Sequence, residues 1–159
     1  PVYDDETIFE FFVLESFQAG LSWITILRKR ENFRKAFDNF DYQKIANYPD
    51  EKVEELMQDA GIIRNRLKIL ATISNAQKFI ETQKEFGSFS KYIWDFIGGK
   101  PIINLPKTLK DVPATTQISD KLAKDLKKRG FKFLGSTVVY AHMQATGLID
   151  DHVTECWVK

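Results

Sequence analysis

Apolar residues recur at helical spacing along nearly the whole chain, and no stretch shows sustained two-residue alternation. This pattern is typical of amphipathic helices and argues against a sheet-based fold. Glycines stand where the helical pattern breaks off, and Asp50 and Ser119 occupy N-cap positions. We therefore predict an all-α fold. The expected helices lie over residues 5–19, 22–38, 50–59, 64–85, 88–97, 118–129 and 136–146, with a short turn near 41–47 and an irregular segment over 99–117.

The composition fits a single globular domain over residues 1–159. Of the 159 residues, 43% are hydrophobic and 13 are Phe, which is enough for a dense helical core. The single cysteine, Cys156, excludes an internal disulfide and favours a reducing cytoplasm. No apolar run approaches the roughly 20 residues that cross a bilayer, and no signal peptide is visible. We expect a cytoplasmic monomer with no membrane partner.

Charge is balanced overall but uneven along the chain. The formal net charge is +1, so it does not by itself indicate a polyanionic partner. Basic residues nevertheless gather in three clusters, namely Arg28–Arg30, Arg64 with Arg66 and Lys68, and Lys127–Arg129 with Lys132. Such a cluster is either a solvated face or a contact for a phosphate backbone.

One carboxylate interrupts the apolar run near the start of the chain. Glu15 shares a helical face with Ile8, Phe11, Phe12 and Ala19, and this face is expected to turn inward. A buried acid costs several kcal/mol unless it is hydrogen-bonded or meets a cation. Glu15 is therefore either a helix-edge acid with its head in solvent or a group that awaits a partner.

An aromatic residue follows this carboxylate closely in sequence. Trp23 comes just after a predicted helix end at Gly20 and a predicted N-cap at Ser22. Its indole is either part of the core or a flat surface on which a planar ligand can stack.

The segment 50–85 has the pattern helix, tight glycine turn, helix, with Gly61 in the turn. Such a hairpin can direct backbone N–H groups at an anion, and Arg64 would add charge beside them. It can equally be an ordinary corner between two helices. The DNA-binding form of this motif usually carries a second glycine two residues after the first, where this chain has Ile63.

The C-terminus carries two potential metal ligands. His152 and Cys156 stand four residues apart, a spacing that suits half of a zinc site. Two ligands alone do not make a structural site, and the other histidine, His142, is expected to pack within a helix.

These features, taken in order, resemble the 3-methyladenine DNA glycosylase I (TAG) family. The similarity runs from about Asp5 to Cys156. The matching blocks are Leu14–Ser16 with Gln18–Thr25, Lys29–Phe33, Asp59–Arg64, Leu126–Gly135 and Gly147–Val153. The resemblance implies a helix-hairpin-helix DNA glycosylase fold, with the hairpin at about 50–85. It also implies an enzyme that removes 3-methyladenine from alkylated double-stranded DNA and releases the free base.

The resemblance further implies roles for single residues. Glu15 would hydrogen-bond the extruded base as the catalytic group, and Trp23 would stack on that base. Because a methylated adenine is cationic, an unpaired buried carboxylate would distinguish it from neutral adenine. Gly20 and Leu21 would lie on the loop that probes the base stack. The hairpin would hold the DNA backbone through Gly61, Ile62, Ile63 and Arg64.

Two departures from related enzymes bear on the mechanism. Many members of the superfamily carry a catalytic Asp about twenty residues past the hairpin glycine, where this chain has Ile80, Glu81 and Thr82, as is typical of TAG. N3-alkylation already makes the purine a good leaving group, so less assistance is required. Family members also begin with a segment that supplies two zinc ligands and part of the base pocket. This chain starts just after that segment, so we expect a structural zinc on His152 and Cys156 in the full-length protein, and weak or no zinc binding by these 159 residues.

Two alternatives to the glycosylase remain at this point. One is a non-catalytic helix-hairpin-helix module that binds DNA through the hairpin and the basic clusters. The other is a helical interaction protein in which Glu15 pairs with a buried Lys or Arg. A carboxylate and an indole that form a pocket would favour the enzyme, because a DNA-binding module needs no such pocket.

Overall fold

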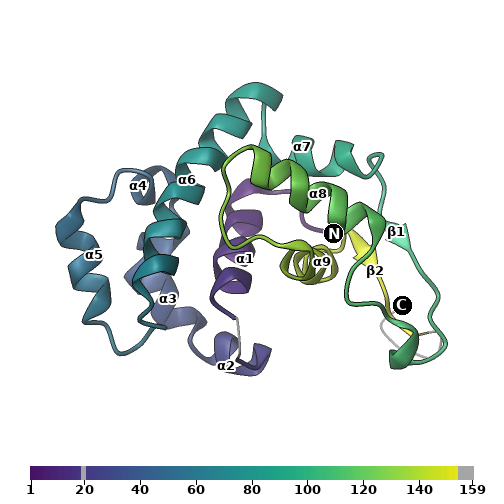
Figure 1. Ribbon diagram of the computed structural model, residues 1–159, viewed down its shortest axis with the longest axis horizontal. Helices are drawn as coiled ribbons and strands as arrows, with labels where there is room; N and C mark the ends of the chain where they lie inside the picture. The colour runs from purple at the N-terminus through teal and green to yellow at the C-terminus, as the bar shows by residue number, and fades with distance from the viewer. Residues whose placement is uncertain (19–20, 154–159) are drawn as a thin grey trace.

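The computed structural model describes residues 1–18 and 21–153, and it is almost entirely helical (Figure 1). Its elements are α1 (Asp5–Phe17), α2 (Trp23–Arg28), α3 (Arg30–Ala36), the 3-10 helix η1 (Asp38–Phe40), α4 (Tyr42–Ile45), α5 (Asp50–Met57), α6 (Arg66–Phe86), α7 (Phe89–Phe96), β1 (Ile102–Ile103), the 3-10 helix η2 (Leu109–Asp111), α8 (Gln117–Lys128), α9 (Ser136–Ala145) and β2 (Ile149–Asp150). The predicted all-α class is confirmed.

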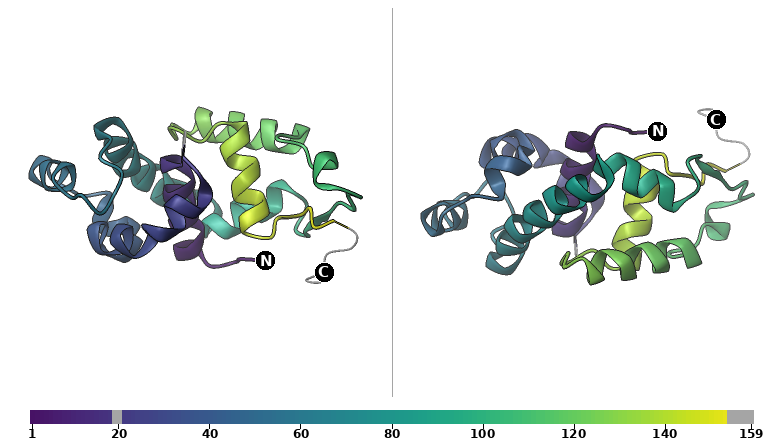
Figure 2. Two further views of the ribbon diagram at one scale, coloured as in Figure 1. Left: turned by 90° about the horizontal axis from the view of Figure 1, so that it is seen from below. Right: turned by 90° about the horizontal axis from the view of Figure 1, so that it is seen from above.

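Helix α1 lies at the centre of the fold and contacts α6, α7 and α9 (Figures 1 and 2). It is apolar around most of its circumference, which is typical of a helix enclosed by others. Aromatic rings fill the space around it. Phe9 packs edge-on against Phe79 with ring centroids 5.2 Å apart, and Phe79 in turn stacks on Phe89 at 4.2 Å. One hydrophobic cluster runs from Ile8 to Ile149.

The predicted helix over 22–38 is in fact two helices, α2 and α3, separated at Lys29. Beyond α3 the backbone passes through three residues with left-handed conformations: Asp38 at φ 52°, Asn39 at φ 56° and Phe40 at φ 58°. Such angles are uncommon for side chains larger than glycine. This turn buries Phe40 to 2% exposure, so core packing outweighs the local backbone preference.

Two of the predicted N-caps are displaced by a short distance, and the third is where it was predicted. Thr116 is the N-cap of α8, and Ser119 lies three residues inside, where the two form a reciprocal capping box. Pro49 is the N-cap of α5, and Asp50 is the first helical residue, in the turn where a negative charge suits the helix dipole. Ser22 is the N-cap of α2 as predicted, and its side chain accepts from the Thr25 N–H at 3.3 Å.

The segment predicted to be irregular contains a short strand. β1 pairs in parallel with β2, with Ile102 opposite Ile149. Strands of two residues are too short to show alternation in the sequence, which explains why they were not predicted. None of the described helices is long and apolar enough to span a membrane.

Candidate active site

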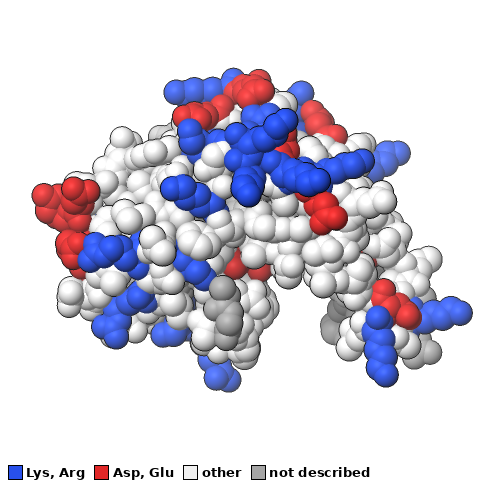
Figure 3. Space-filling model, in the orientation of Figure 1, with Lys and Arg blue, Asp and Glu red and all other residues white. Residues whose placement is uncertain are grey.

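A cavity of about 350 Å³ opens where the end of α1 meets α2 and α9. Its walls are formed by Glu15, Gln18, Trp23, Ala141, Gln144 and Ala145. The space-filling view shows the surface hollowed between α2 and the loop that carries η2 (Figure 3). The structure thus brings Glu15 and Trp23 to the same cavity.

Glu15 is buried, with 4% of its surface exposed. Burial raises the pKa of its carboxyl to about 7, because the charged form loses its hydration. Within residues 1–18 and 21–153 no hydrogen bond or ion pair engages its carboxylate. The prediction of an inward-facing acid is confirmed, and a helix-edge acid in solvent is excluded.

Glu10, on the same helix, is a buried acid whose charge is neutralised by neighbouring cations. It is 8% exposed and pairs with Arg30 at 2.6 Å and Arg34 at 3.1 Å. Glu15 has no such cation among the described residues. The alternative in which Glu15 pairs with a buried Lys or Arg is therefore wrong for the part of the chain that the structure describes.

Trp23 lies half-buried at the first residue of α2. Its indole packs against Phe11, with ring centroids 6.4 Å apart and planes inclined by 28°. This contact fixes the ring at the cavity wall beside Glu15. Leu21, two residues earlier, is 39% exposed, whereas Gly20 lies outside the described residues.

The predicted hairpin at 50–85 is a helix, a turn and a helix, formed by α5 and α6. Its turn glycine is closely packed: a Cβ on Gly61 would stand 3.0 Å from Asp59 Oδ1 and 3.1 Å from Asn32, so these side chains would have to shift by a few tenths of an ångström. The Gly61 N–H already donates to the Asp59 carboxylate at 2.8 Å. The side chain of Ile62 is 3% exposed and belongs to the core. Arg64 is exposed and makes no ion pair with any described residue.

Some cations of the basic clusters form ion pairs within the fold, and others do not. Arg129 pairs with Glu85 at 2.7 Å and Asp125 at 2.9 Å, and Arg66 pairs with Glu54. Arg30 pairs with Glu10 as described above. Among the described residues of these clusters the following basic side chains make no ion pair: Arg28, Lys29, Arg64, Lys68, Lys127, Lys128 and Lys132. The last three lie at the end of α8 and in the turn after it.

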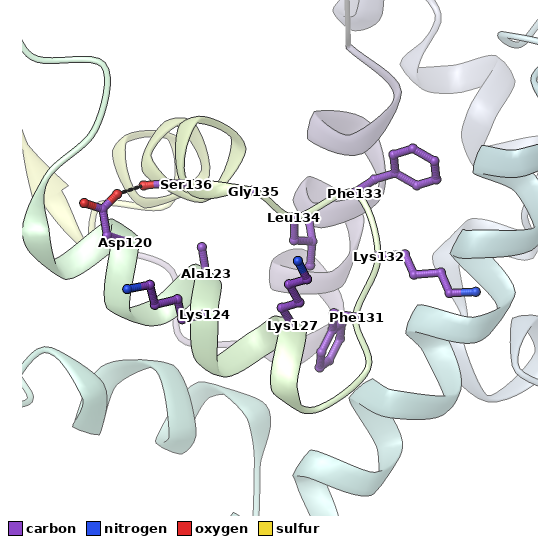
Figure 4. A pocket seen from close by; sticks show the side chains of 10 residues that line it. All are labelled: Asp120, Ala123, Lys124, Lys127, Phe131, Lys132, Phe133, Leu134, Gly135 and Ser136. Carbon is purple, nitrogen blue, oxygen red and sulfur yellow. Dashed lines mark hydrogen bonds between the residues drawn. The ribbon is translucent and has the colours of Figure 1, made fainter.

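The α8–α9 turn forms a second cavity, of about 640 Å³, which sequence analysis did not predict (Figure 4). Its lining combines apolar side chains with Lys124, Lys127 and Lys132. Phe133 at its edge has a left-handed φ of 60° and is 45% exposed. Asn75 holds the turn by two hydrogen bonds to the backbone of Lys132, at 2.8 and 2.9 Å. The signal in the sequence was the pair of glycines that flank Phe131–Leu134 between two helical patterns.

Of the two predicted metal ligands, His152 lies near the end of the described chain. The His152 ring is exposed, and its Nδ1 contacts Asp150 Oδ1 at 2.8 Å, which leaves Nε2 directed elsewhere. Cys156 lies outside the described residues. Within the described ranges no group of three or more His, Cys, Asp or Glu side chains could hold a metal ion.

Comparison with known proteins places the chain in a family. The methyladenine glycosylase family model matches residues 1–159. DNA-3-methyladenine glycosylase 1 of Escherichia coli K12 is 48% identical over 98% of this chain and 83% of its own length. DNA-3-methyladenine glycosylase of Haemophilus influenzae is 46% identical over 100% of this chain and 86% of its own. A variant 3-methyladenine DNA glycosylase I, solved in complex with 3-methyladenine, superimposes with a TM-score of 0.97 at 37% identity, covering 100% of this chain and 86% of that one. The chain belongs to the methyladenine glycosylase family.

Proposed function

We propose that this protein is a base-excision repair enzyme that hydrolyses the N-glycosidic bond of 3-methyladenine in alkylated DNA. The observation that carries the proposal is the buried carboxylate of Glu15, which has no partner among the described residues and lines a cavity together with Trp23. A flipped base needs an aromatic surface and hydrogen bonds to its edge, and this cavity offers both. The relatives named above carry the same activity in their names.

The charge of the damaged base explains why an unpaired acid suits this site. N3-methylation leaves the purine cationic, so Glu15 would supply its counter-charge, and the base would provide the partner that Glu15 does not have among the described residues. When the bond to C1′ breaks, the bonding electrons neutralise the base, and water adds to the sugar. The leaving base needs no proton, so no separate general acid is required. Contact with the cation would also lower the pKa of Glu15 and favour its ionised form.

The protein would hold DNA through contacts to the phosphate backbone of the DNA. These contacts would lie on the face shown in Figure 3, where Lys and Arg side chains gather over α8. We propose that Leu21, with Gly20, enters the gap left by the extruded nucleotide, because an apolar wedge compensates for lost stacking. The hairpin residues Gly61 to Arg64 would approach the backbone mainly through Arg64, since the Gly61 N–H and the Ile62 side chain are already engaged.

The α8–α9 turn supplies a further contact for the same strand. Helix α9 begins at Gly135 with no side-chain cap and no acidic residue in its first turn. The first N–H groups of a helix have no acceptor within the helix, and Gly135 and Ser136 line the same cavity as Lys127 and Lys132, an arrangement that favours a phosphate. Asp120 lies in this cavity as well, but its carboxylate accepts a hydrogen bond from Ser136 (Figure 4).

We also propose a structural zinc in the full-length protein, with His152 and Cys156 as two of its ligands. The contact of His152 Nδ1 with Asp150 supports the proposal, because a carboxylate hydrogen bond to one ring nitrogen commonly orients an imidazole that binds metal through the other. Such an ion would stabilise the C-terminal segment and take no part in the chemistry at Glu15. The enzyme would act as a cytoplasmic monomer.

The test is chromatographic analysis of the bases that the full-length protein releases from methylated DNA. The proposed function predicts release of 3-methyladenine that Glu15→Gln abolishes or strongly reduces. A non-catalytic DNA-binding module would bind the same DNA and release no base, and that result would overturn the proposal.

A further inference from the structure

A second acidic residue lies beside the cavity that contains Glu15 and holds one of its walls. The carboxylate of Asp151 accepts three side-chain hydrogen bonds. Its Oδ1 accepts from Asn104 Nδ2 at 2.7 Å. Its Oδ2 accepts from Gln144 Nε2 at 3.0 Å and from the hydroxyl of Tyr140. One carboxylate thus joins helix α9 to the segment that follows β1.

The position of this carboxylate is fixed from the backbone as well. Asp151 directly follows β2, which pairs with β1. The Asn104 N–H donates to the carbonyl of Asp150 at 2.9 Å, and the ring of Tyr140 is 2% exposed. A carboxylate anchored at both oxygens, on a backbone that is itself hydrogen-bonded, can impose an orientation on the groups that donate to it.

Gln144 is the member of this network that lines the cavity, together with Glu15 and Trp23. Because Nε2 donates to Asp151, the amide oxygen Oε1 is turned away from that carboxylate. Within the described residues no donor reaches Oε1. The cavity therefore contains two hydrogen-bond acceptors without protein donors, the Glu15 carboxylate and the Gln144 amide oxygen.

We propose that Asp151 is a positioning residue that sets Gln144 so that its amide oxygen accepts a hydrogen bond from the exocyclic amino group of the extruded adenine. The inference rests on the proposed function and adds a basis for selectivity. 3-Methyladenine carries an amino group at C6, whereas 3-methylguanine carries a carbonyl there. Gln144 is exposed in the free protein, and a base that fills the cavity would displace water from its amide oxygen. The guanine carbonyl would then face that oxygen with no proton between them, and two acceptors that lose water without gaining a donor are costly.

The decisive variant is Asp151→Asn, which keeps the size of the side chain and reverses the polarity of one of its atoms. An Asn amide at this position can donate to Gln144 Oε1, so the Gln144 amide turns over and presents N–H groups to the base. We expect this variant to bind free 3-methyladenine about tenfold more weakly by calorimetry. Its preference for releasing 3-methyladenine over 3-methylguanine from methylated DNA should shrink by a similar factor.

The double variant Asp151→Asn, Gln144→Glu separates positioning from a structural role. A carboxylate at position 144 accepts both from the Asn amide and from the base, so affinity and preference should return to within about threefold of the parent. Asn104→Ala is the control, because it removes a hydrogen bond to the same carboxylate without contacting Gln144, and it should leave the base preference unchanged.

Three outcomes would count against this inference. If the parent releases 3-methyladenine and Asp151→Asn keeps the affinity and the preference of the parent, Asp151 does not position Gln144. If the double variant fails to recover although it melts at the temperature of the parent, the amide orientation is not the cause. A parent protein that releases no base would overturn the proposed function, and this inference with it.

Discussion

The imidazole of His142 lies flat on the ring of Phe12, with ring centroids 4.0 Å apart and planes inclined by 16°. Neither of its nitrogens has a hydrogen-bond partner among the residues that the structure describes. Burial lowers the pKa of this histidine to about 3. The packing of α9 on α1 thus places an ionisable imidazole in an apolar position that a phenyl ring could fill.

His142→Phe should stabilise the protein most at acidic pH. Histidine titrates near 6.5 in the unfolded chain, so only the unfolded state takes up a proton between about pH 6.5 and pH 3. Stability is therefore lost as the pH falls through that window. Chemical denaturation should show the variant at least as stable as the parent at pH 8, with a further advantage of about 3 kcal/mol at pH 4. Parallel pH profiles for the two proteins would contradict this account of His142.

Glu15→Gln should weaken the binding of 3-methyladenine and stabilise the folded protein. The raised pKa of Glu15 means that its ionisation opposes folding: the penalty is absent below about pH 4.5 and complete above about pH 7. The variant should be more stable than the parent by up to about 3 kcal/mol at pH 8 and by little at pH 5. Calorimetry at pH 8 should show sharply weaker binding of free 3-methyladenine. Unchanged affinity would mean that the Glu15 carboxylate does not bind the base.

Glu10→Gln is the matched control on the same helix. It removes a carboxylate that Arg30 and Arg34 already neutralise, so it should destabilise the protein at pH 8 and leave base binding intact. The same substitution should therefore have opposite effects on stability at positions 10 and 15. Stabilisation by both variants would mean that burial, and not the lack of a partner, governs the two acids.

Sequence patterns predicted what depends on local periodicity and on single residues with an unusual role. The helical class, the inward-facing Glu15 and the N-cap at Ser22 all follow from spacing and residue type. Contacts between distant segments could not be read in this way. The left-handed turn at Asp38–Phe40 buries Phe40, a tertiary effect that overrides local preference.

The same limit applies to the site. Nothing in the sequence indicated that Gln144 would share a cavity with Glu15, because the two lie far apart in sequence and their proximity depends on how α9 packs on α1. Basic residues were also indistinguishable until their partners were known. Arg64 and Arg66 stand two apart, yet only Arg66 is paired with an acid among the described residues.

This difference between Arg64 and Arg66 gives a test of the DNA contact. Arg64→Gln should weaken binding to duplex DNA and lower the slope of log K against log salt by about 1, because one phosphate contact is lost. Arg66→Gln removes the same charge from a residue already engaged by Glu54 and should change the slope little. Gly61→Val is a poor probe, since its side chain would also require Asp59 and Asn32 to shift, which mixes a packing effect with the DNA contact. Equal salt slopes for parent and Arg64→Gln would favour an ordinary helix corner at this turn.

Leu21→Ala should impair excision more than binding. The exposed Leu21 side chain is available to fill the space of an extruded nucleotide, and its loss leaves the flipped state without compensation for lost stacking. Single-turnover release of 3-methyladenine should slow while affinity for undamaged duplex changes by less than about twofold, since phosphate contacts dominate that affinity. Ile24→Ala is the control, because it removes an exposed apolar side chain that lies nearby on α2. Equal losses in the two variants would argue against a wedge at Leu21.

The zinc proposal predicts a dependence on both ends of the full-length protein. Structural zinc closes a four-ligand tetrahedron, and His152 with Cys156 supplies two ligands at most. Metal analysis should find about one zinc per full-length chain and little in a protein limited to residues 1–159. His152→Ala should abolish the bound zinc and lower the temperature of unfolding, as chelation should in the parent. At a temperature where the variant stays folded, its affinity for free 3-methyladenine should match the parent, because the ion is proposed to be remote from Glu15. Tight stoichiometric zinc in residues 1–159 alone, or none in the intact protein, would overturn the proposal.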